Sequence, residues 1–292
     1  MKRQDFRHLE RLRVRWAEVD LQKIVFNGHY LMYADTAVAG YWRALAMPYH
    51  QTMEQLQGDL YVRKATLEYV GSARYDEQLE VGIRCARIGK TSLVFETAVY
   101  RGDAVLVHGE LVYVFADPKS MTSQPVPDLL RTVCTAFEDG APMLDVAIEP
   151  WAAAAAELRL LREQVLVQVR EQQQQQQQLP AVLVEDPDDQ RAVHVVARNR
   201  FGLLVGAGRV VLGSDGVAQL GRMVVLASLH GAGAGRLLLQ SLMRAAKDGA
   251  CTVVALHASS AAAGFYAREG FSAVGAAFEH AGVQHQAMRR SV

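Results

Sequence analysis

The residues from Trp16 to Tyr30 could do carbonyl chemistry, because a carboxylate stands shortly before a predicted helix. Asp20 lies in a predicted loop, and the helix is expected to begin near Asn27. The first N–H groups of a helix have no partner within it, so those at Asn27 could polarise a thioester carbonyl. The Asp20 carboxylate could then attack that carbonyl or activate a water molecule. Spacing alone favours a simpler interpretation, in which Asp20 only caps a turn.

A second candidate site is a glycine-rich turn between a predicted strand over residues 220–226 and a predicted helix. Glycines let the backbone approach a ligand closely, and N–H groups at a helix N-terminus can bind a pyrophosphate. Three interpretations stay open from the spacing. A dinucleotide-binding fingerprint lacks its third glycine, because Arg236 stands there. A P-loop lacks its Gly-Lys-Ser/Thr ending, and a turn without any ligand is the third interpretation.

The elements expected around Asp20 are one long helix and an antiparallel sheet. Apolar positions at helical spacing predict a helix over residues 27–46. Alternating residues and glycine-containing turns predict strands over residues 9–16, 59–71, 77–87, 91–101 and 104–116. This order predicts an α+β layer, in which the helix packs on one face of the sheet.

The composition changes in the middle of the chain, which indicates two domains. Residues 118–150 carry Pro, Ser and Asp in place of the strand-like alternation before them, and we place the boundary near 140–150, with domains over 1–140 and 141–292. A long helix is predicted from Trp151, and it runs into seven glutamines that begin at Gln172. We expect a frayed helix end or loop over 172–180. Further elements are predicted at 252–257 (a strand), 261–271 (a short helix) and up to Met288 (a strand pair).

Length, charge and cysteine content bound the class of protein. The 292 residues suit two domains, and with Lys+Arg and Asp+Glu both at 31 no basic excess points to nucleic acid or an anionic membrane. Cys85, Cys134 and Cys251 lack metal-ligand spacing, so we expect buried thiols and no metal site. The first ten residues are charged, and no apolar run reaches the roughly 18 residues that span a bilayer. A cytoplasmic location is therefore expected.

The stretch around Asp20 resembles the 4-hydroxybenzoyl-CoA thioesterase family of hotdog enzymes, in its YbgC/FadM-like branch. The resemblance is carried by Asp20, the triplet Ile24-Val25-Phe26, the pair Tyr30-Leu31 and the segment 88–93, and it spans roughly residues 8–135. It implies a hotdog fold, in which an antiparallel sheet wraps a long central helix. It also implies that Asp20 is the catalytic carboxylate, that the N–H of Asn27 polarises the carbonyl, and that Tyr30, Thr91 and Ser92 contact the substrate.

Two departures from that family concern substrate preference or rate. Lys23 stands where many relatives have Gly, and Asn27 stands where many have His or Tyr. His29 is a candidate base, although a neutral structural role is equally open at a helix N-terminus. Glu18 is expected to be a solvated or structural charge. Because the active sites of the family lie across a subunit interface, the resemblance implies a homodimer or homotetramer.

The second half resembles the GNAT superfamily, in its ElaA-like branch, over about residues 150–292. The coenzyme loop of that superfamily is matched by His230-x-x-Gly233-x-Gly235, and its next helix by Phe265-Tyr266-Ala-Arg-Glu-Gly270-Phe271. The resemblance implies an α/β domain with a mixed sheet that binds acetyl-CoA or acyl-CoA as a substrate. No tightly bound cofactor is expected.

The GNAT resemblance also assigns roles to single residues. The backbone around Met223 and Val225 would hold the pantetheine arm, and Tyr266 would return a proton to the departing CoA thiolate. The pyrophosphate would lie on the loop residues His230, Gly231, Gly233, Gly235 and Arg236. Arg or Gln is usual at the position of His230, which adds less positive charge. For Tyr266 the simpler interpretation is a half-buried helix aromatic.

Two hypotheses follow for the whole chain. In the first, it is a bifunctional enzyme that hydrolyses an acyl-CoA in its first half and transfers an acyl group from CoA to an amine in its second. In the other, one half is a catalytically silent CoA sensor or scaffold. The acceptor amine and the base that deprotonates it are not identified; His257, Glu279 and His285 are candidates for that base.

Overall fold

The chain divides into two compact units, Met1–Met143 and Leu144–Val292, and each is described by itself. The computed structural model describes residues 1–173, 186–280 and 282–292. The division between the units falls inside the predicted boundary region. Gln172 and Gln173 belong to a helix, whereas the rest of the predicted loop over 172–180 lies outside the described residues.

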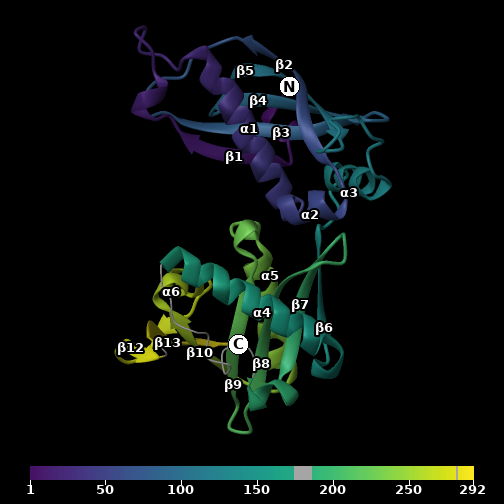
Figure 1. The fold of residues 1–292 in the computed structure, drawn as a ribbon. Helices are drawn as coiled ribbons and strands as arrows, with labels where there is room; N and C mark the ends of the chain where they lie inside the picture. The colour runs from purple at the N-terminus through teal and green to yellow at the C-terminus, as the bar shows by residue number, and fades with distance from the viewer. Residues whose placement is uncertain (174–185, 281) are drawn as a thin grey trace. The chain divides into compact units, whose positions relative to one another are not determined.

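The first unit is a five-stranded antiparallel sheet with a long helix across one face (Figure 1). The strand order is β1-β3-β4-β5-β2. The strands are β1 (His8–Arg13), β2 (Asp59–Tyr69), β3 (Gln78–Ile88), β4 (Ser92–Arg101) and β5 (Ala104–Ala116). The helix α1 (Asn27–Ala44) contacts β1, β3 and β4 and buries one face, including Tyr30, Ala37 and Tyr41. The predicted hotdog arrangement is confirmed.

Several elements of the first unit differ from the predictions. The first strand ends at Arg13, and Trp16 lies exposed in the 3-10 helix η2 (Trp16–Glu18). The helices α2 (Tyr49–Gln55) and α3 (Asp128–Glu138) were not predicted. The helix α3 lies in residues 118–150, where no element was predicted, although its buried Leu130, Val133, Cys134 and Phe137 recur at helical spacing.

The second unit is a mixed sheet of eight strands in the order β11-β13-β10-β9-β8-β7-β6, with β12 paired to β13. Its strands are β6 (Leu144–Glu149), β7 (Val193–Asn199), β8 (Leu204–Leu212), β9 (Val217–Val225), β10 (Val253–Ser259), β11 (Ser272–Ala273), β12 (Phe278–His280) and β13 (Val283–Ser291). The pair β9–β10 is parallel and the other pairs are antiparallel. The predicted mixed sheet is confirmed, and β6 extends it with residues for which no strand was predicted.

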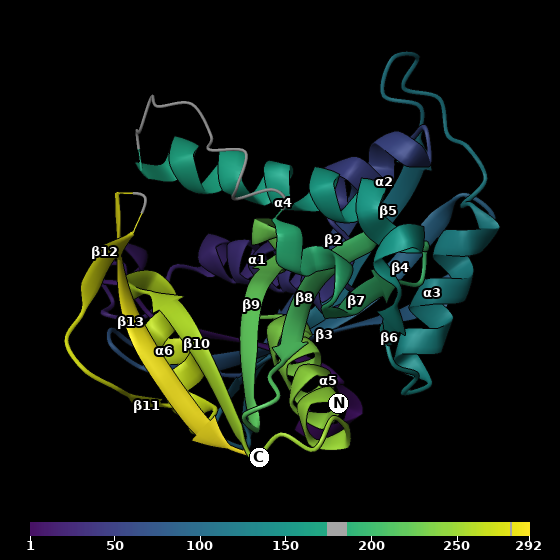
Figure 2. The same ribbon diagram turned by 90° about the horizontal axis from the view of Figure 1, so that it is seen from below.

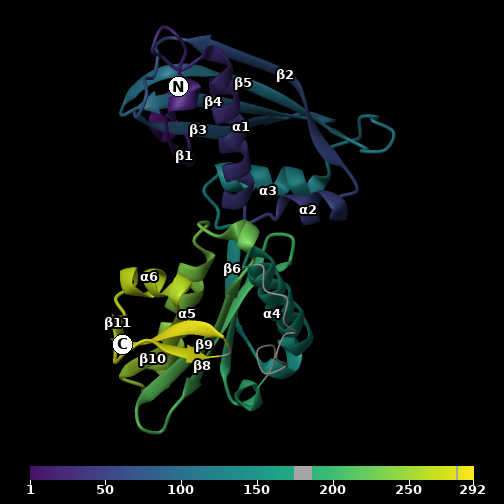
Figure 3. The same cartoon turned by 60° about the vertical axis from the view of Figure 1, so that its left-hand side comes forward.

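Helices cover both faces of this second sheet (Figure 3). The helix α4 (Trp151–Gln173) contacts β8 and β9 on one face. The helices α5 (Ala234–Asp248) and α6 (Ser260–Arg268) lie on the opposite face. The helix α5 buries Leu238, Leu239 and Leu242 against the sheet, because these apolar residues recur at helical spacing.

Candidate active sites

The loop that carries Asp20 is a tight turn between η2 and α1. The N–H of Asp20 donates to the carbonyl of Ile24 at 2.9 Å, and the N–H of Lys23 donates to the carbonyl of Asp20 at 2.9 Å. One carboxylate oxygen, Oδ1, accepts the N–H of Gln22 at 2.8 Å. The other oxygen has no hydrogen-bond donor among the described residues. Asp20 thus caps its own turn and still presents one oxygen for chemistry.

Glu18 holds this loop against the body of the unit. It is buried and accepts hydrogen bonds from the Arg15 backbone at 2.8 Å and the Tyr33 hydroxyl at 2.7 Å. Burial alone would raise the pKa of Glu18, but these hydrogen bonds and the Arg15 guanidinium outweigh it, so the pKa is lowered. Its carbonyl also accepts the N–H of Phe26 at 2.9 Å. Of the two roles expected for Glu18, a solvated or a structural charge, its burial supports the structural one.

Lys23 lies in the left-handed region, with φ at 62°. A residue with a Cβ atom adopts this region at a cost that glycine does not have. The backbone of the turn therefore gives a physical reason for the glycine that many members of the resembled family carry here.

The start of α1 offers unpaired backbone donors next to this turn. The residue before the helix, Phe26, makes no side-chain cap, and Asn27 is exposed. No acceptor within the described residues pairs with the N–H groups of Asn27 and Gly28. The carbonyl of Asn27 accepts the Tyr69 hydroxyl at 3.1 Å, which fixes the first turn. The turn closes where Asp20 pairs with Ile24, and α1 begins three residues later, at Asn27.

Tyr30 is buried at 2 % relative exposure, with its hydroxyl accepting the N–H of Ala73 at 2.9 Å. Its ring makes edge contacts with Tyr33 at 5.8 Å and Tyr69 at 5.7 Å between centroids. Burial raises the pKa of Tyr30. The hydrogen bond of Tyr30 therefore links α1 to the loop at Ala73. The expected contact between Tyr30 and the substrate stays a prediction.

Thr91 and Ser92 lie at the opposite end of the sheet from Asp20. The strand β3 runs from Gln78, which pairs with Arg13, to Ile88, which pairs with Leu93. At about 3.3 Å per residue, the two ends of β3 are roughly 30 Å apart. The Asp20 loop joins the Gln78 end, because the N–H of Val25 donates to Ala73 at 2.9 Å. One chain does not bring Thr91 and Ser92 to Asp20.

In the second unit, β9 and β10 pair at one end and diverge at the other (Figure 2). Their parallel pairing runs from Val217–Val253 to Leu220–Leu256 and stops there. The strand β9 continues through Met223 to Val225 without pairing to β10. Peptide groups on that edge are open to an extended ligand, which could add to the edge as a strand does.

The glycine-rich loop after β9 adopts a conformation that its glycines require. Gly231 and Gly233 have φ values of 85° and 87°, and Gly233 is the N-cap of α5. An added Cβ would meet nothing within 4 Å at either residue, so the backbone faces open space. The N–H groups of Gly231, Gly233, Ala234 and Gly235 have no acceptor within the described residues. Such a set of donors at a helix N-terminus suits a pyrophosphate.

The two side chains predicted beside this loop already have partners. His230 is exposed, and its Nε2 lies 3.1 Å from the carbonyl of Val225. Arg236 forms an ion pair with Glu269, with Nε and Oε1 2.9 Å apart. This pair joins the start of α5 to the end of α6, and the Arg236 side chain remains 64 % exposed.

Tyr266 lies on α6, packed between two other aromatic rings. Its ring centroid is 5.0 Å from that of Phe265 and 5.7 Å from that of Phe271. Burial raises the pKa of Tyr266 to about 12. The hydroxyl therefore carries its proton at neutral pH, and it makes no hydrogen bond to the described residues.

Comparisons with known proteins fit each unit separately. A model of the thioesterase superfamily matches residues 22–108, and a model of the acetyltransferase (GNAT) domain matches residues 160–292. The chain carries a thioesterase-superfamily domain followed by a GNAT acetyltransferase domain. Asp20 lies just before the first matched range, whereas Asn27, Tyr30, Thr91 and Ser92 lie inside it.

Relatives of known sequence are similar to one domain each. The acyl-CoA thioester hydrolase YbgC of Escherichia coli is 27% identical over 120 residues, which cover 40% of this chain and 87% of that protein. The uncharacterized N-acetyltransferase YjcF of Bacillus subtilis is 36% identical over 87 residues, which cover 30% of this chain and 61% of that protein. A solved 1,4-dihydroxy-2-naphthoyl-CoA thioesterase from Synechocystis aligns with a TM-score of 0.41 at 13% identity and covers 44% of this chain and 95% of its own.

Other features bear on cofactors and location. All three cysteines are buried and free. Within residues 1–173, 186–280 and 282–292, no group of three or more His, Cys, Asp or Glu side chains is placed to hold a metal ion. None of the helices in that part of the chain has the length and apolar character needed to cross a membrane.

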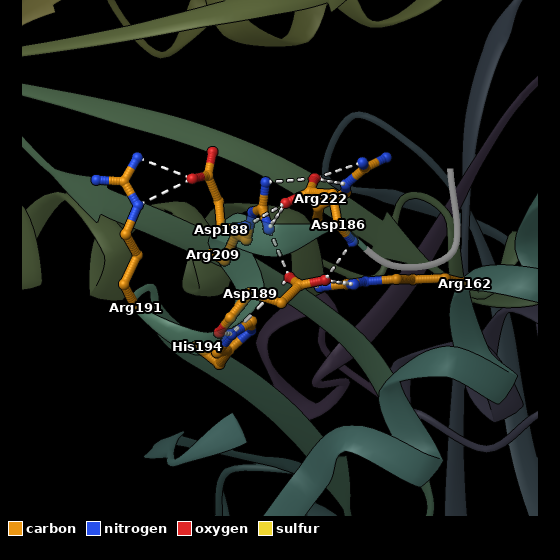
Figure 4. Close-up of polar contacts among 8 residues, drawn as sticks. All are labelled: Arg162, Asp186, Asp188, Asp189, Arg191, His194, Arg209 and Arg222. Atoms are coloured by element: carbon orange, nitrogen blue, oxygen red, sulfur yellow. Dashed lines mark hydrogen bonds and ion pairs between the residues drawn. The ribbon is translucent and has the colours of Figure 1, made fainter. Parts of the chain in front are cut away.

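The GNAT domain contains a buried ionic network that the sequence did not reveal (Figure 4). Asp189 is fully buried and accepts hydrogen bonds from both terminal nitrogens of Arg162, at 2.8 and 3.0 Å. Its carbonyl lies 2.7 Å from Nε2 of the buried His194, whose ring packs against Trp151 with centroids 5.0 Å apart. Arg162 and Asp189 belong to segments that resembled the ElaA-like branch, but only their burial identifies a network.

Acid should destabilise the GNAT domain through Asp186 and Asp189. Burial alone would raise both pKa values, but arginine hydrogen bonds outweigh it, from Arg209 and Arg222 at Asp186 and mainly from Arg162 at Asp189, so both are lowered. An unfolded Asp titrates near 3.9, so this stabilisation is present above about pH 4 and lost as pH falls further.

Urea unfolding at pH 7 and pH 3 checks this prediction in the wild type and in Asp186→Asn. The wild type should lose more unfolding free energy between the two pH values than the variant, which lacks one of the titrating groups. Equal losses in the two proteins would contradict it.

Proposed function

We propose that the thioesterase domain hydrolyses an acyl-CoA with Asp20 as its catalytic carboxylate. The free carboxylate oxygen would attack the thioester carbonyl or take a proton from the attacking water. The N–H of Asn27 would stabilise the negative charge that develops on the carbonyl oxygen. The products are a carboxylic acid and free CoA. The observations that support this proposal most directly are the open Asp20 oxygen and the unpaired donors at the start of α1, which follows the Asp20 turn in the chain.

A homodimer or homotetramer would complete this site. Thr91 and Ser92 lie about 30 Å from the Asp20 end of β3 in one chain. In the proposed arrangement, a second subunit brings its Thr91 and Ser92 to the Asp20 loop. Tyr30 would then act mainly by fixing α1, through its bond to Ala73.

We further propose that the GNAT domain transfers an acetyl or acyl group from CoA to an amine. The backbone of Met223 and Val225 would bind the pantetheine arm, because that edge of β9 is unpaired with β10. The pyrophosphate would accept hydrogen bonds from the loop at Gly231, Gly233 and Gly235, with Arg236 adding positive charge. The amine attacks the thioester carbon and loses a proton to solvent, and the C–S bond breaks. Tyr266 gives its proton to the CoA sulfur and regains one from solvent.

The substrate class is supported by what the relatives are named for. YbgC is named as an acyl-CoA thioester hydrolase and YjcF as an N-acetyltransferase. The proposal places the protein in the cytoplasm, where both reactions find acyl-CoA, and includes no nucleic acid or membrane partner. Acetyl-CoA or acyl-CoA would be a substrate, with no tightly bound cofactor.

Product analysis tests both reactions in the full-length protein. Thiol release from a panel of acetyl-, medium-chain and aromatic acyl-CoAs measures hydrolysis. Mass spectrometry of the same mixtures with a panel of primary amines measures amide formation. Free acid together with amide supports two enzymes in one chain, and the absence of both products refutes the proposal.

The alternative is that the GNAT domain binds CoA without catalysis, as a sensor. His230 favours this alternative, because its ring already engages the carbonyl of Val225, a proposed pantetheine contact. Lys23 raises the same question for the thioesterase domain. Calorimetry with CoA and acetyl-CoA separates the cases: binding without amide formation supports a sensor, and no binding refutes both roles.

A further inference from the structure

The outer part of the buried network joins Asp186 to Arg222, a residue of β9 (Figure 4). Nη2 of Arg222 lies 2.6 Å from Oδ2 of Asp186, and Nε lies 3.2 Å from the same oxygen. Arg209 of β8 binds both oxygens of Asp186 at 2.7 Å. The Asp186 and Arg222 side chains are 14 % and 19 % exposed, so the pair is largely shielded from water.

Asp186 is itself fixed in place by the inner part of the network. Its N–H donates to Oδ2 of Asp189 at 3.1 Å, and Nη1 of Arg209 reaches Oδ1 of Asp189 at 2.6 Å. Asp189 in turn binds Arg162 of α4. Asp186 therefore presents its carboxylate to Arg222 from a position that contacts to Asp189 and Arg209 define.

Arg222 has an unusual backbone conformation at an important point of β9. Its φ is 54°, in the left-handed region that residues with a Cβ atom rarely adopt. The β8–β9 register shifts there, since Ala207 pairs with Val224 but Arg209 pairs with Gly221. One residue of β8, Gly208, thus faces both Arg222 and Met223, which is a β-bulge.

The bulge coincides with the place where β9 leaves β10. The last β9–β10 pair is Leu220–Leu256, immediately before the bulge. A bulge bends its strand and increases the local twist, so this one directs Met223 and Val225 away from β10. The packing is close, because a Cβ on Gly208 would lie 2.9 Å from Sδ of Met223.

We propose that Asp186 and Arg222 are a positioning pair, which holds the β9 bulge and thereby sets the edge that binds the pantetheine arm. The ion pair acts through the backbone of β9 and does not touch the coenzyme. This inference rests on the proposed binding of CoA by the GNAT domain. Without the pair, the side chain of Arg222 holds its backbone less firmly in the left-handed conformation, and the edge samples orientations that bind CoA poorly.

The test uses calorimetry of CoA with the full-length protein and four variants. Gly233→Val, whose loop cannot keep φ at 87° without strain, identifies the part of the isotherm that belongs to the GNAT domain. Arg222→Gly removes the tether but suits the left-handed backbone. Arg222→Lys keeps the charge and one ionic contact, and Asp186→Asn removes the charge that holds Arg222.

We expect Arg222→Gly and Asp186→Asn to weaken CoA binding at the GNAT site by roughly 10-fold, as the loss of a charge-assisted hydrogen bond implies. Arg222→Lys should recover part of that loss. Acyl-CoA hydrolysis by the thioesterase domain should stay unchanged in every variant. The direction in which Asp186→Asn changes CoA affinity is decisive. If only electrostatic attraction to the CoA phosphates mattered, removing a negative charge would strengthen binding, whereas the proposal expects weaker binding.

One result would overturn the proposal. CoA affinity within about twofold of the wild type in both Arg222→Gly and Asp186→Asn would show that the pair only stabilises the fold. Thermal unfolding of the same samples shows whether each variant is folded. If Asp186→Asn is unfolded, the CoA affinity of Arg222→Gly by itself tests the proposal. Failure of the proposed function looks different: the wild type itself would show no CoA binding that Gly233→Val removes.

Discussion

Replacing Asp20 with asparagine should lower the kcat of acyl-CoA hydrolysis by about 10³-fold, the range of a lost general base or nucleophile. Asparagine keeps an oxygen that can accept the N–H of Gln22, so the turn stays capped. It lacks the negative charge that attacks the carbonyl or activates water. The substitution therefore separates the two roles that the sequence left open for Asp20.

Steady-state thiol release from the acyl-CoA panel measures this effect. Asp20→Ala should lose as much activity as Asp20→Asn and some stability besides, because it also removes the cap. Asp139→Asn, at the exposed end of α3, is a matched control and should hydrolyse normally. Full activity in Asp20→Asn would assign Asp20 to the turn alone. CoA binding by the GNAT domain should be unaffected by all three substitutions.

Replacing Tyr266 with phenylalanine should slow acyl transfer by about 10²-fold, as expected when a general acid is lost. The ring contacts with Phe265 and Phe271 do not depend on the hydroxyl, which has no hydrogen-bond partner among the described residues. Stability and CoA affinity should therefore change little. Because the pKa of Tyr266 is raised to about 12, its proton should remain available up to at least pH 10.

Amide formation with saturating acetyl-CoA, followed by mass spectrometry, gives the transfer rate. Hydrolysis by the thioesterase domain of the same preparation serves as an internal control, since Tyr266 belongs to the other unit. A transfer rate equal to that of the wild type would make Tyr266 a packing residue of α6. A lower unfolding midpoint in Tyr266→Phe would mean that the hydroxyl contributes to the fold.

Local patterns in the sequence were enough for most of the architecture. Helical spacing predicted α1 and the start of α4, and alternation with glycine turns predicted β2 to β5. These elements are determined by the pattern of residue types within a few positions, and this pattern can be read from the sequence. The helix α3 was missed because the Pro- and Asp-containing residues around it dominated the composition, although its buried Leu130, Val133 and Phe137 carry the helical period.

The candidate residues came from motifs, and the structure added their surroundings. The sequence identified Asp20, the glycine loop and Tyr266 by type and order. Only the tertiary structure placed Thr91 and Ser92 at the far end of the sheet, because strand register is set by pairing between distant segments. It also revealed that His230 and Arg236 already have partners within the domain.

The ionic network marks the limit of what the sequence by itself determined. Arg162, Asp189 and Arg209 each read as an ordinary charge, and nothing local says that they are buried together. The network joins residues of α4, of the 3-10 helix Pro187–Gln190 with its N-cap Asp186, and of two strands, so folding alone brings them into contact. The sequence determined two domains and the residues suited to acyl-CoA chemistry. The tertiary structure decided how β9 bends, because a buried charge must be paired and the pairing fixes the backbone that carries it.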